Sequence, residues 1–435
     1  MGVAGRRVAR ASSRPGRRFG VLRGLYVARG PAAGVLGLAL LLIAGIAGCD
    51  VRGMPVAGGA GRTVGPVTVY VANQAEDTVT PLRAASNTAG RPIRVAPAPA
   101  LIAISPDGQT AYVAGVGSLL PDAAAPVTLT AIRTATNRPG RAITVCAPEN
   151  LGGVLAPDAI AITPDSRTVY VSCRGTVVPV RAGADTASEP IRVSSAGALA
   201  MAAGGRTVYV ANPDGDTITP ISTTTEQPGQ PIVVGPSPDA MTVTPDGSTL
   251  LVLTSTGVTG ITPVDAATNR AGTPVAIQGA YAVAVAPGGG TAYALAMPDP
   301  NSQQGFVVPI HIRTSTAGTP IKVGLSPIQI AFTPDGQMAY VANSASGNVT
   351  PILLADGRAE PAIAAGKIPT DLAVSPDGTT VYVLDSNIFG GIGPGMLSGK
   401  SPFGLGQVIP IHVATNSTEK PIKVGRLPIA IAVAS

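Results

Sequence analysis

The sequence of 435 residues is poor in several kinds of side chain: it has no Trp, 3% aromatic residues and only 12% charged residues. Disordered chains combine high charge density with few β-branched residues, whereas this chain is rich in Val, Ile and Thr. Long helices are excluded because 54 Gly and 42 Pro interrupt the chain every few residues. The composition therefore predicts a core built from short elements.

Histidine and cysteine are also scarce, with two and three residues respectively. Acid–base hydrolysis needs convergent His, Glu or Arg groups. His311 and His412 occur in two copies of one Pro-Ile-His segment, which predicts equivalent strand positions and neither a metal pair nor a general base. We expect no catalytic residue, no metal site and no cofactor. Calcium is the one weak candidate, because the segment from Asn212 to Asp216 has part of a calcium-loop pattern.

Acidic residues are absent from the first 48 positions, which contain eight Arg. The apolar run from Ala32 to Gly48 follows the last of these Arg and ends at Cys49, as in an export signal. The segment Ile46 to Cys49 resembles the lipobox of bacterial lipoprotein signal peptides, and this resemblance implies cleavage before Cys49 and lipidation of its sulfur. A signal anchor is the alternative, but 17 weakly apolar residues are at the lower limit for a membrane span.

We therefore expect three parts: a lipoprotein signal peptide at 1–48, the lipidated Cys and a flexible tether at 49–66, and a folded domain at 67–435. The protein would be exported and anchored to the outer side of the bacterial cytoplasmic membrane or to the cell surface. Of the 30 basic residues, eight precede Cys49, so 22 remain against 24 acidic ones, a net charge of −2. The basic pI thus belongs to the leader, and no nucleic-acid partner is expected.

From residue 68 the chain repeats a unit of about 42 residues. Each copy has four short segments, β-branched or alternating and bounded by Gly, Pro, Asn or Asp, which is typical of short strands. One position recurs eight times, at Tyr70, Tyr112, Tyr170, Tyr209, Leu251, Tyr293, Tyr340 and Tyr382. Four antiparallel strands per unit predict the blades of a β-propeller.

The pieces Tyr-Val-Ala-Asn, Thr-Val-Thr-Pro, Pro-Ile-x-Val-Gly and Pro-Asp-Gly resemble, in this order, the YVTN family of β-propeller repeats, with lactonase-like and surface-layer-like relatives. The resemblance implies that the Pro-Asp-Gly hairpin joins the innermost strand to the Tyr strand. Because the chain starts on a second strand at Thr68, the inner strand from Ile429 to Ala434 must complete the first blade. We expect one all-β propeller of eight four-stranded antiparallel blades, with seven as the alternative.

Two recurring residues have structural explanations. Seven of the nine Tyr share one strand position, which predicts packing between blades and no stacking platform for bases. A Pro recurs in the third strand, as at Pro81, and since Pro cannot donate to a ladder we expect a bulge there.

Strand alternation places the loops after the second and fourth strands at one end of the ring, and all sizeable insertions fall in these loops. They contain Phe306, Phe389 and Phe403, three of the four Phe beyond the leader, together with Met396. These side chains are either pinned on the ring or available to a partner. The loop from Asn387 to Gln407 is the main candidate for a recognition element.

The same face carries polar candidates at the start of the inner strands. Asp158, Asp239 and Asp371 occupy matching places in the repeat alignment, near Tyr281 and Gln329. Their oxygens could hold a cation or a polar ligand around the channel, or they could cap the strand starts.

Cys146 and Cys173 end an outer strand and the following Tyr strand, and both point to this face. In an exported protein they are candidates for a disulfide, although the one-blade offset could exceed the reach of the bond.

The sequence thus favours an extracytoplasmic, lipid-anchored propeller that serves as a non-catalytic binding or protein-interaction scaffold through its insertion-rich face. The expected partners are the membrane and an envelope protein, a polymer or a small ligand. A lactonase-like hydrolase is the alternative, suggested only by fold kinship.

Overall fold

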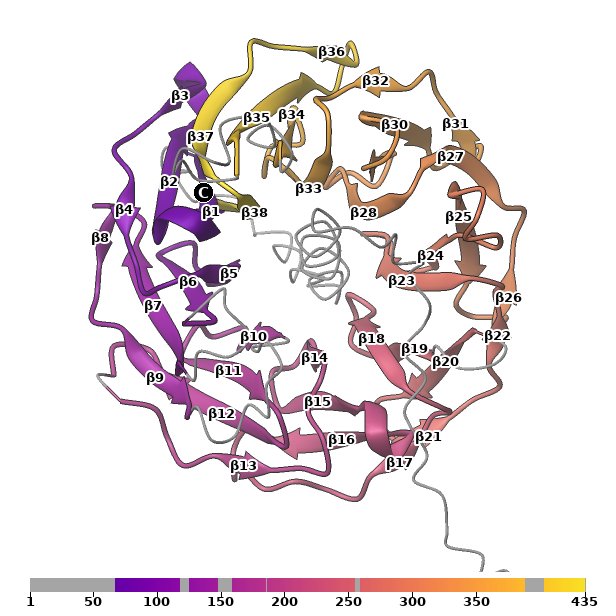
Figure 1. The fold of residues 1–435 in the computed structure, drawn as a ribbon. Helices are drawn as coiled ribbons and strands as arrows, with labels where there is room; N and C mark the ends of the chain where they lie inside the picture. The colour runs from indigo at the N-terminus through magenta and orange to yellow at the C-terminus, as the bar shows by residue number, and fades with distance from the viewer. Residues whose placement is uncertain are drawn as a thin grey trace, which may run out of the picture. The chain divides into compact units, whose positions relative to one another are not determined.

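The structure is a computed structural model that describes residues 67–117, 125–147, 159–184, 186–254, 259–387 and 403–434. All of these residues belong to one compact unit. They form eight antiparallel sheets in a ring, which we name blades A to H in chain order (Figure 1). Each innermost strand contacts the innermost strands of both neighbouring blades. The prediction of eight blades is therefore confirmed.

The innermost strands, from blade A to blade H, are β38 (Pro428–Ala434), β5 (Pro99–Ile104), β10 (Ile160–Ile162), β14 (Leu199–Met201), β18 (Pro238–Val243), β23 (Ala280–Val285), β28 (Pro327–Phe332) and β33 (Pro369–Val374). The second strands are β1 (Thr68–Asn73), β6 (Thr110–Gly115), β11 (Thr168–Cys173), β15 (Thr207–Asn212), β19 (Thr249–Thr254), β24 (Thr291–Ala296), β29 (Met338–Asn343) and β34 (Thr380–Asp385).

The third strands are β2 (Thr78–Arg83), β7 (Val127–Arg133), β12 (Thr176–Arg181), β16 (Thr217–Ser222), β20 (Gly260–Asp265), β25 (Gln304–His311), β30 (Asn348–Leu353) and β35 (Leu405–His412). Most outer strands are split in two: β3 (Thr88–Ala89) and β4 (Ile93–Arg94), β8 (Arg138–Pro139) and β9 (Ile143–Cys146), β21 (Arg270–Ala271) and β22 (Val275–Ala276), β26 (Thr316–Ala317) and β27 (Ile321–Leu325), β31 (Arg358–Ala359) and β32 (Ile363–Ala364), β36 (Ser417–Thr418) and β37 (Ile422–Arg426). Blades C and D have the single outer strands β13 (Ile191–Arg192) and β17 (Ile232–Val233). Three 3₁₀ turns complete the described part: η1 (Gln74–Glu76), η2 (Ala84–Ser86) and η4 (Pro213–Gly215).

The two ends of the ring meet in blade A, where the C-terminal strand β38 pairs antiparallel with β1. Val71 lies opposite Ile431, and both side chains are fully buried. This pairing removes the two open edges that an unclosed ring would present. The predicted closure by the C-terminal strand is thus confirmed.

The core lies between neighbouring blades. Val71 and Leu82 of blade A, for example, are in one buried cluster with Leu384 and Val408 of blade H. The second-strand tyrosines add polar links, since Tyr70 Oη donates to Asn137 Oδ1 of the next blade at 2.7 Å. Burial raises the pKa of Tyr70 to about 12, so its hydroxyl stays protonated and able to donate.

The Pro-Asp-Gly hairpins close the face opposite the insertions. In blade C, where Ser166 replaces the hairpin Gly, Thr163 Oγ1 donates to Asp165 Oδ1 at 2.6 Å, and the N–H of Arg167 donates to the same oxygen at 3.0 Å. These two hydrogen bonds hold the pKa of the Asp165 carboxyl below its ordinary value. The last hairpin position favours glycine for two reasons, as Gly247 shows. Its φ is +71°, and a Cβ there would lie 2.7 Å from Ala203 Cβ in the neighbouring hairpin.

The bulge expected at the third-strand Pro lies in the outer strand opposite it: in blade A the pairing changes from Val79 opposite Ile93 to Leu82 opposite Ala89, so three outer residues face two residues of β2. In seven blades this Pro lies opposite the second-strand Tyr or Leu without a register shift. The carbonyl of Pro81 accepts from the N–H of Gly90 in the outer segment at 2.7 Å, so its nitrogen faces the same outer edge. Because the outer strand is interrupted there between β3 and β4, no ladder donor is lost.

Candidate binding face

Blades F and H extend further than the others on the insertion-bearing face. Their third strands, β25 and β35, have eight residues, and their outer strands continue as far as Leu325 and Arg426. The additional pairs at the two tips are Gln304 opposite Leu325 and Leu405 opposite Arg426. Blades F and H, the two neighbours of blade G, thus end in matching tips.

Each tip exposes a leucine. Leu325 is 37% exposed and Leu405 is 49% exposed, and among the described residues Val233 in blade D is the other exposed large apolar side chain. An exposed leucine on its own needs no explanation. Two at equivalent tips, on the face where the insertions gather, mark a candidate contact surface, which we call the leucine tips.

A glycine in each extended third strand allows the tip to lie close against the next blade. A Cβ on Gly305 would lie 2.4 Å from Pro327 Cδ, and one on Gly406 would lie 2.2 Å from Pro428 Cγ. Both prolines start the inner strand of the next blade. Only glycine permits the extended third strand to pass this close to its neighbour.

The two described aromatic candidates are half-buried. Phe306 lies in β25 opposite Ala296. The carbonyl of Phe403 accepts from Arg426 Nη1 at 2.7 Å, and Arg426 Nε lies 3.6 Å from Glu76 Oε1 of blade A. Arg426 therefore ties the chain after the long insertion to the first blade. The other two candidates, Phe389 and Met396, lie outside the described residues.

The polar candidates do not share one register position. Asp239 and Tyr281 are the extra residues of bulges at the start of the inner strands of blades E and F. Gln329 and Asp371 lie one position later, paired with the second strands of blades G and H. Asp239 is exposed, whereas Asp371 is buried. Asp158, the remaining member, lies outside the described residues.

Three of these side chains link four consecutive blades. The hydroxyl of Tyr281 donates to the carbonyl of Pro327, and Gln329 Nε2 donates to Asp371 Oδ1 at 3.4 Å. Asp371 Oδ2 in turn accepts from the N–H of Ile431 in β38 at 2.9 Å. The carboxylate thus provides a hydrogen-bond acceptor for a backbone N–H on the free edge of the inner strand β38. These bonds favour the capping interpretation of Asp371.

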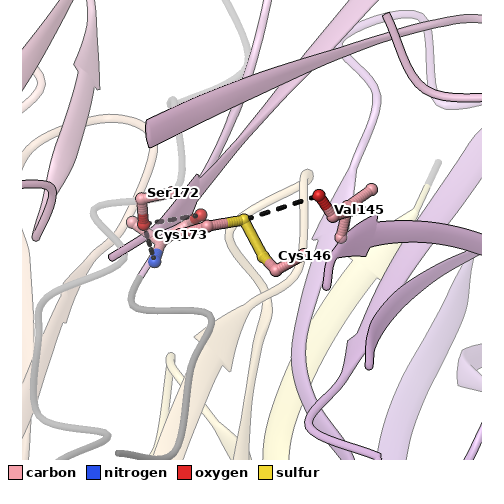
Figure 2. Close-up of a disulfide and its surroundings, with 5 residues drawn as sticks. Val145, Cys146, Ser172 and Cys173 are labelled. Atoms are coloured by element: carbon pink, nitrogen blue, oxygen red, sulfur yellow. Dashed lines mark hydrogen bonds between the residues drawn. A yellow bond between two sulfur atoms is a disulfide. The ribbon is translucent and has the colours of Figure 1, made fainter. Parts of the chain in front are cut away.

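A disulfide joins Cys146 of blade B to Cys173 of blade C, with a Cα–Cα distance of 5.9 Å (Figure 2). The blade offset is therefore within reach of the bond. At the matching place between blades H and A, Gly425 N donates to Asn73 Oδ1 at 3.0 Å, and a Cβ on Gly425 would lie 2.5 Å from Asn73 Cγ. The disulfide thus replaces a Gly–Asn contact that the repeat uses elsewhere.

The side chains that acid–base chemistry needs do not gather in the described part of the chain. His311 and His412 occupy equivalent exposed positions in β25 and β35, and His412 Nε2 lies 2.5 Å from Glu419 Oε1. The described residues contain no group of three or more His, Cys, Asp or Glu with the geometry to hold a metal ion. In the calcium-like segment, Asp216 Oδ1 accepts from the N–H of Ser237, and Asn212 Nδ2 donates to Thr219 Oγ1.

A hollow of about 380 Å³ lies on the opposite face, between the hairpins of blades E and F. Blade F has Pro-Gly-Gly-Gly where five other blades have a hairpin that begins with Pro-Asp, and the missing side chains leave room there. Its lining includes Asp246, Ser248, Gly289, Gly290 and Arg313. Asp246 Oδ1 already accepts hydrogen bonds from the Thr244 hydroxyl and from the N–H of Ser248 in its own hairpin. Arg313 is therefore the one cationic side chain that lines the hollow, and the Asp246 carboxylate there is already hydrogen-bonded.

No protein-family model matches the chain, and no curated protein matches its sequence. Among solved structures it is similar to the dihydro-heme d1 dehydrogenase NirN in complex with DHE, with a TM-score of 0.66 at 15% identity over 88% of this chain and 79% of that one. It is also similar to the hydrazine synthase of Kuenenia stuttgartiensis, with a TM-score of 0.53 at 19% identity over 66% and 92%. A protein provisionally named a 6-phosphogluconolactonase, from Bacteroides fragilis, gives 0.52 at 14% over 71% and 98%.

These likenesses show a shared fold: the chain contains a β-propeller. Within the described residues no helix is long and apolar enough to cross a membrane.

Sequence reasoning missed Leu325 and Arg426, and it included Leu405 only as part of the loop from Asn387 to Gln407. The signal lay in the paired segments Gln304-Gly-Phe and Leu405-Gly-Gln, each with a glycine four residues before the third-strand Pro. Their meaning depends on the prolines of the next blade, which are neighbours only in space.

Proposed function

We propose that the protein is an extracytoplasmic, lipid-anchored propeller that binds an envelope partner through the leucine tips without catalysing a reaction. The observation that carries the proposal is the pair of exposed leucines at equivalent tips of blades F and H. Apolar anchors surrounded by polar neighbours are the common centre of protein interfaces. Here the neighbours are Gln304 and Arg426, directly opposite each leucine.

The rigid framework supports this role. Gly305 and Gly406 hold each extended strand against the next blade, and Arg426 links the tip of blade H to blade A. A partner therefore meets leucines whose backbone is already fixed, which lowers the entropy lost on binding.

The test is site-specific photo-cross-linking in the native envelope. A cross-linking amino acid at Leu325 and, separately, at Leu405 should trap the same partner, whereas one at Val233, which is 71% exposed in blade D, should not. Replacement of both tip leucines by Asp should abolish the cross-link made from a neighbouring position such as Gln304. Equal trapping from Val233 and from the tips would refute a specific surface.

The lactonase-like alternative rests on fold kinship with the Bacteroides fragilis protein. It requires activity on lactones or esters that survives the Leu325→Asp and Leu405→Asp changes. Turnover by the purified chain would replace the scaffold proposal.

A further inference from the structure

The outer walls of blades A and B are unusually basic. They are formed by residues 83–95 and 133–147, which run from the end of the third strand through the outer strand, and neither segment contains an acidic residue. Each segment contributes three exposed arginines. These six residues, which we call the arginine wall, are Arg83, Arg91, Arg94, Arg133, Arg138 and Arg141.

The propeller repeat does not require arginines at these places. The matching segments of the other six blades contain at most two Lys or Arg each, and all but that of blade F contain an acidic residue. The segments compared are 181–193, 222–234, 265–277, 311–323, 353–365 and 412–424.

The arrangement in blade B opposes folding. Arg133 and Arg138 lie directly opposite each other in β7 and β8. At the same register in blade E the pair is Asp265 opposite Arg270, which has opposite charges. Like charges directly opposite in a sheet are destabilising. An acidic residue at position 133 would therefore make the fold more stable than Arg133 does.

The two walls adjoin, because β4 of blade A contacts β8 of blade B. Ion pairs elsewhere in the described residues involve Arg181, Arg358, His412 and Arg426, and none of them includes an arginine of the wall. The wall therefore presents concentrated positive charge to an external anion. Guanidinium groups suit phosphate well, since they can donate two parallel hydrogen bonds.

We propose that the arginine wall binds the phosphate headgroups of the anionic bilayer to which the chain is anchored. Blade A contains β1, the first strand of the ring, and only 17 residues separate Cys49 from Val67. Even fully extended, 17 residues span only about 60 Å. An anchor at Cys49 therefore keeps blade A, where the tether joins the ring, within that distance of the membrane. This inference goes beyond the scaffold function and rests on its membrane anchor.

Docking on this wall sets the orientation of the ring. With blades A and B against the bilayer, the ring stands edge-on and the leucine tips of blades F and H stay accessible beside it. A lipid anchor combined with a basic surface gives two attachment points, which is the usual requirement for stable placement at a membrane.

The experiment measures vesicle binding by the chain from Asp50 to Ser435, which lacks Cys49 and retains every described strand and the β1–β38 closure. Its thermal unfolding is first compared with that of the full chain. The probes are phosphatidylcholine vesicles with and without phosphatidylglycerol. We expect binding only to the anionic vesicles at low salt, with release at high salt.

In a variant with Arg91, Arg94, Arg138 and Arg141 replaced by Gln, the partition coefficient for anionic vesicles should fall roughly 25-fold. A convex wall brings about two arginines to a flat membrane at one time, and each contributes a factor of about five. A control with Arg206, Arg313, Lys367 and Lys420 replaced by Gln has the same net charge and should lose less than twofold. Equal losses in the two variants would overturn the proposal, as would failure of the parent chain to bind.

Arg133→Asp separates binding from folding. It rebuilds the pair of opposite charges found in blade E, so the melting temperature should be unchanged or higher while vesicle binding falls. A fall in both would indicate a structural role and contradict the proposal. Soluble polyphosphate serves as a competitor: binding to it that is tighter than binding to vesicles would identify a polymer as the ligand. None of these outcomes affects the cross-linking test of the leucine tips.

Discussion

Removal of the disulfide between Cys146 and Cys173 tests the junction of blades B and C. The two residues are 27 apart in sequence, and in the chain-entropy model a closed loop of that length stabilises the fold by about 3.5 kcal/mol at 25 °C. For a domain of about 370 residues the entropy of unfolding is about 0.8 kcal/mol/K, so the melting temperature of the Cys146→Ser, Cys173→Ser variant should fall by about 4–5 °C.

The geometry of the repeat supplies a sharper comparison. Between blades H and A, Gly425 and Asn73 occupy the matching positions and share a hydrogen bond of 3.0 Å. The variant Cys146→Gly, Cys173→Asn rebuilds this contact, and it should recover about 1 kcal/mol relative to the double serine variant.

Differential scanning calorimetry of the three proteins, with and without reductant, measures both effects. Reductant should lower the melting temperature of the parent protein to that of the double serine variant and leave the two variants unchanged. Identical melting of parent and double serine proteins, or free thiols at both positions in non-reducing peptide mapping, would refute the reasoning.

Three further predictions concern the ring itself. Deletion of Pro428 to Ser435 removes β38 from blade A and reopens the ring, so calorimetry should show loss of the whole cooperative transition; an unchanged transition would contradict closure by this strand. Gly406→Ala places a Cβ against Pro428 and should cost about 1–3 kcal/mol in urea unfolding, whereas Gly204→Ala, which meets no atom within 4 Å, should be near neutral; equal effects would contradict the close packing at the tip. The pKa values of Tyr70, Tyr340 and Tyr382 are raised to about 12 by burial, so their contribution to stability is full below pH 10 and is lost as pH rises toward 12; tyrosinate absorbance should therefore appear together with unfolding, and tyrosine ionisation in the intact fold near pH 10 would contradict their burial.

The regular features of the fold were predictable from the sequence because they depend on neighbouring residues. The hairpin at Asp165 closes through Thr163 and the backbone of Arg167, all within five residues. The closure of blade A followed from counting strands, since the first copy lacks an inner strand and the last copy has one to spare. The bulge at the third-strand Pro was predictable because Pro cannot donate to a ladder, whereas the strand that carries the extra residue was not, because the sequence does not mark the gap between β3 and β4.

The candidate site was less predictable because its geometry arises between blades. Asp239 directly follows the first residue of its inner strand, whereas Asp371 comes one residue later, so the bulge that both strands share leaves Asp239 unpaired and places Asp371 opposite Leu384. A single extra residue moves a side chain to the other face of a strand, so an alignment without register could not separate them. Leu325 and Leu405 became visible only through their exposure at the tips of two extended ladders.

The sequence by itself determined the number of blades, their strand order and the place where the ring closes, since the period, the turn residues and the two chain ends are all properties of the sequence. Only the tertiary structure decided which glycines pack against the next blade, which polar side chains meet across blades, and which charged residues of one wall have no ion-pair partner among the described residues. Those properties depend on residues tens to hundreds of positions apart, and packing between blades brings them within a few ångströms of each other.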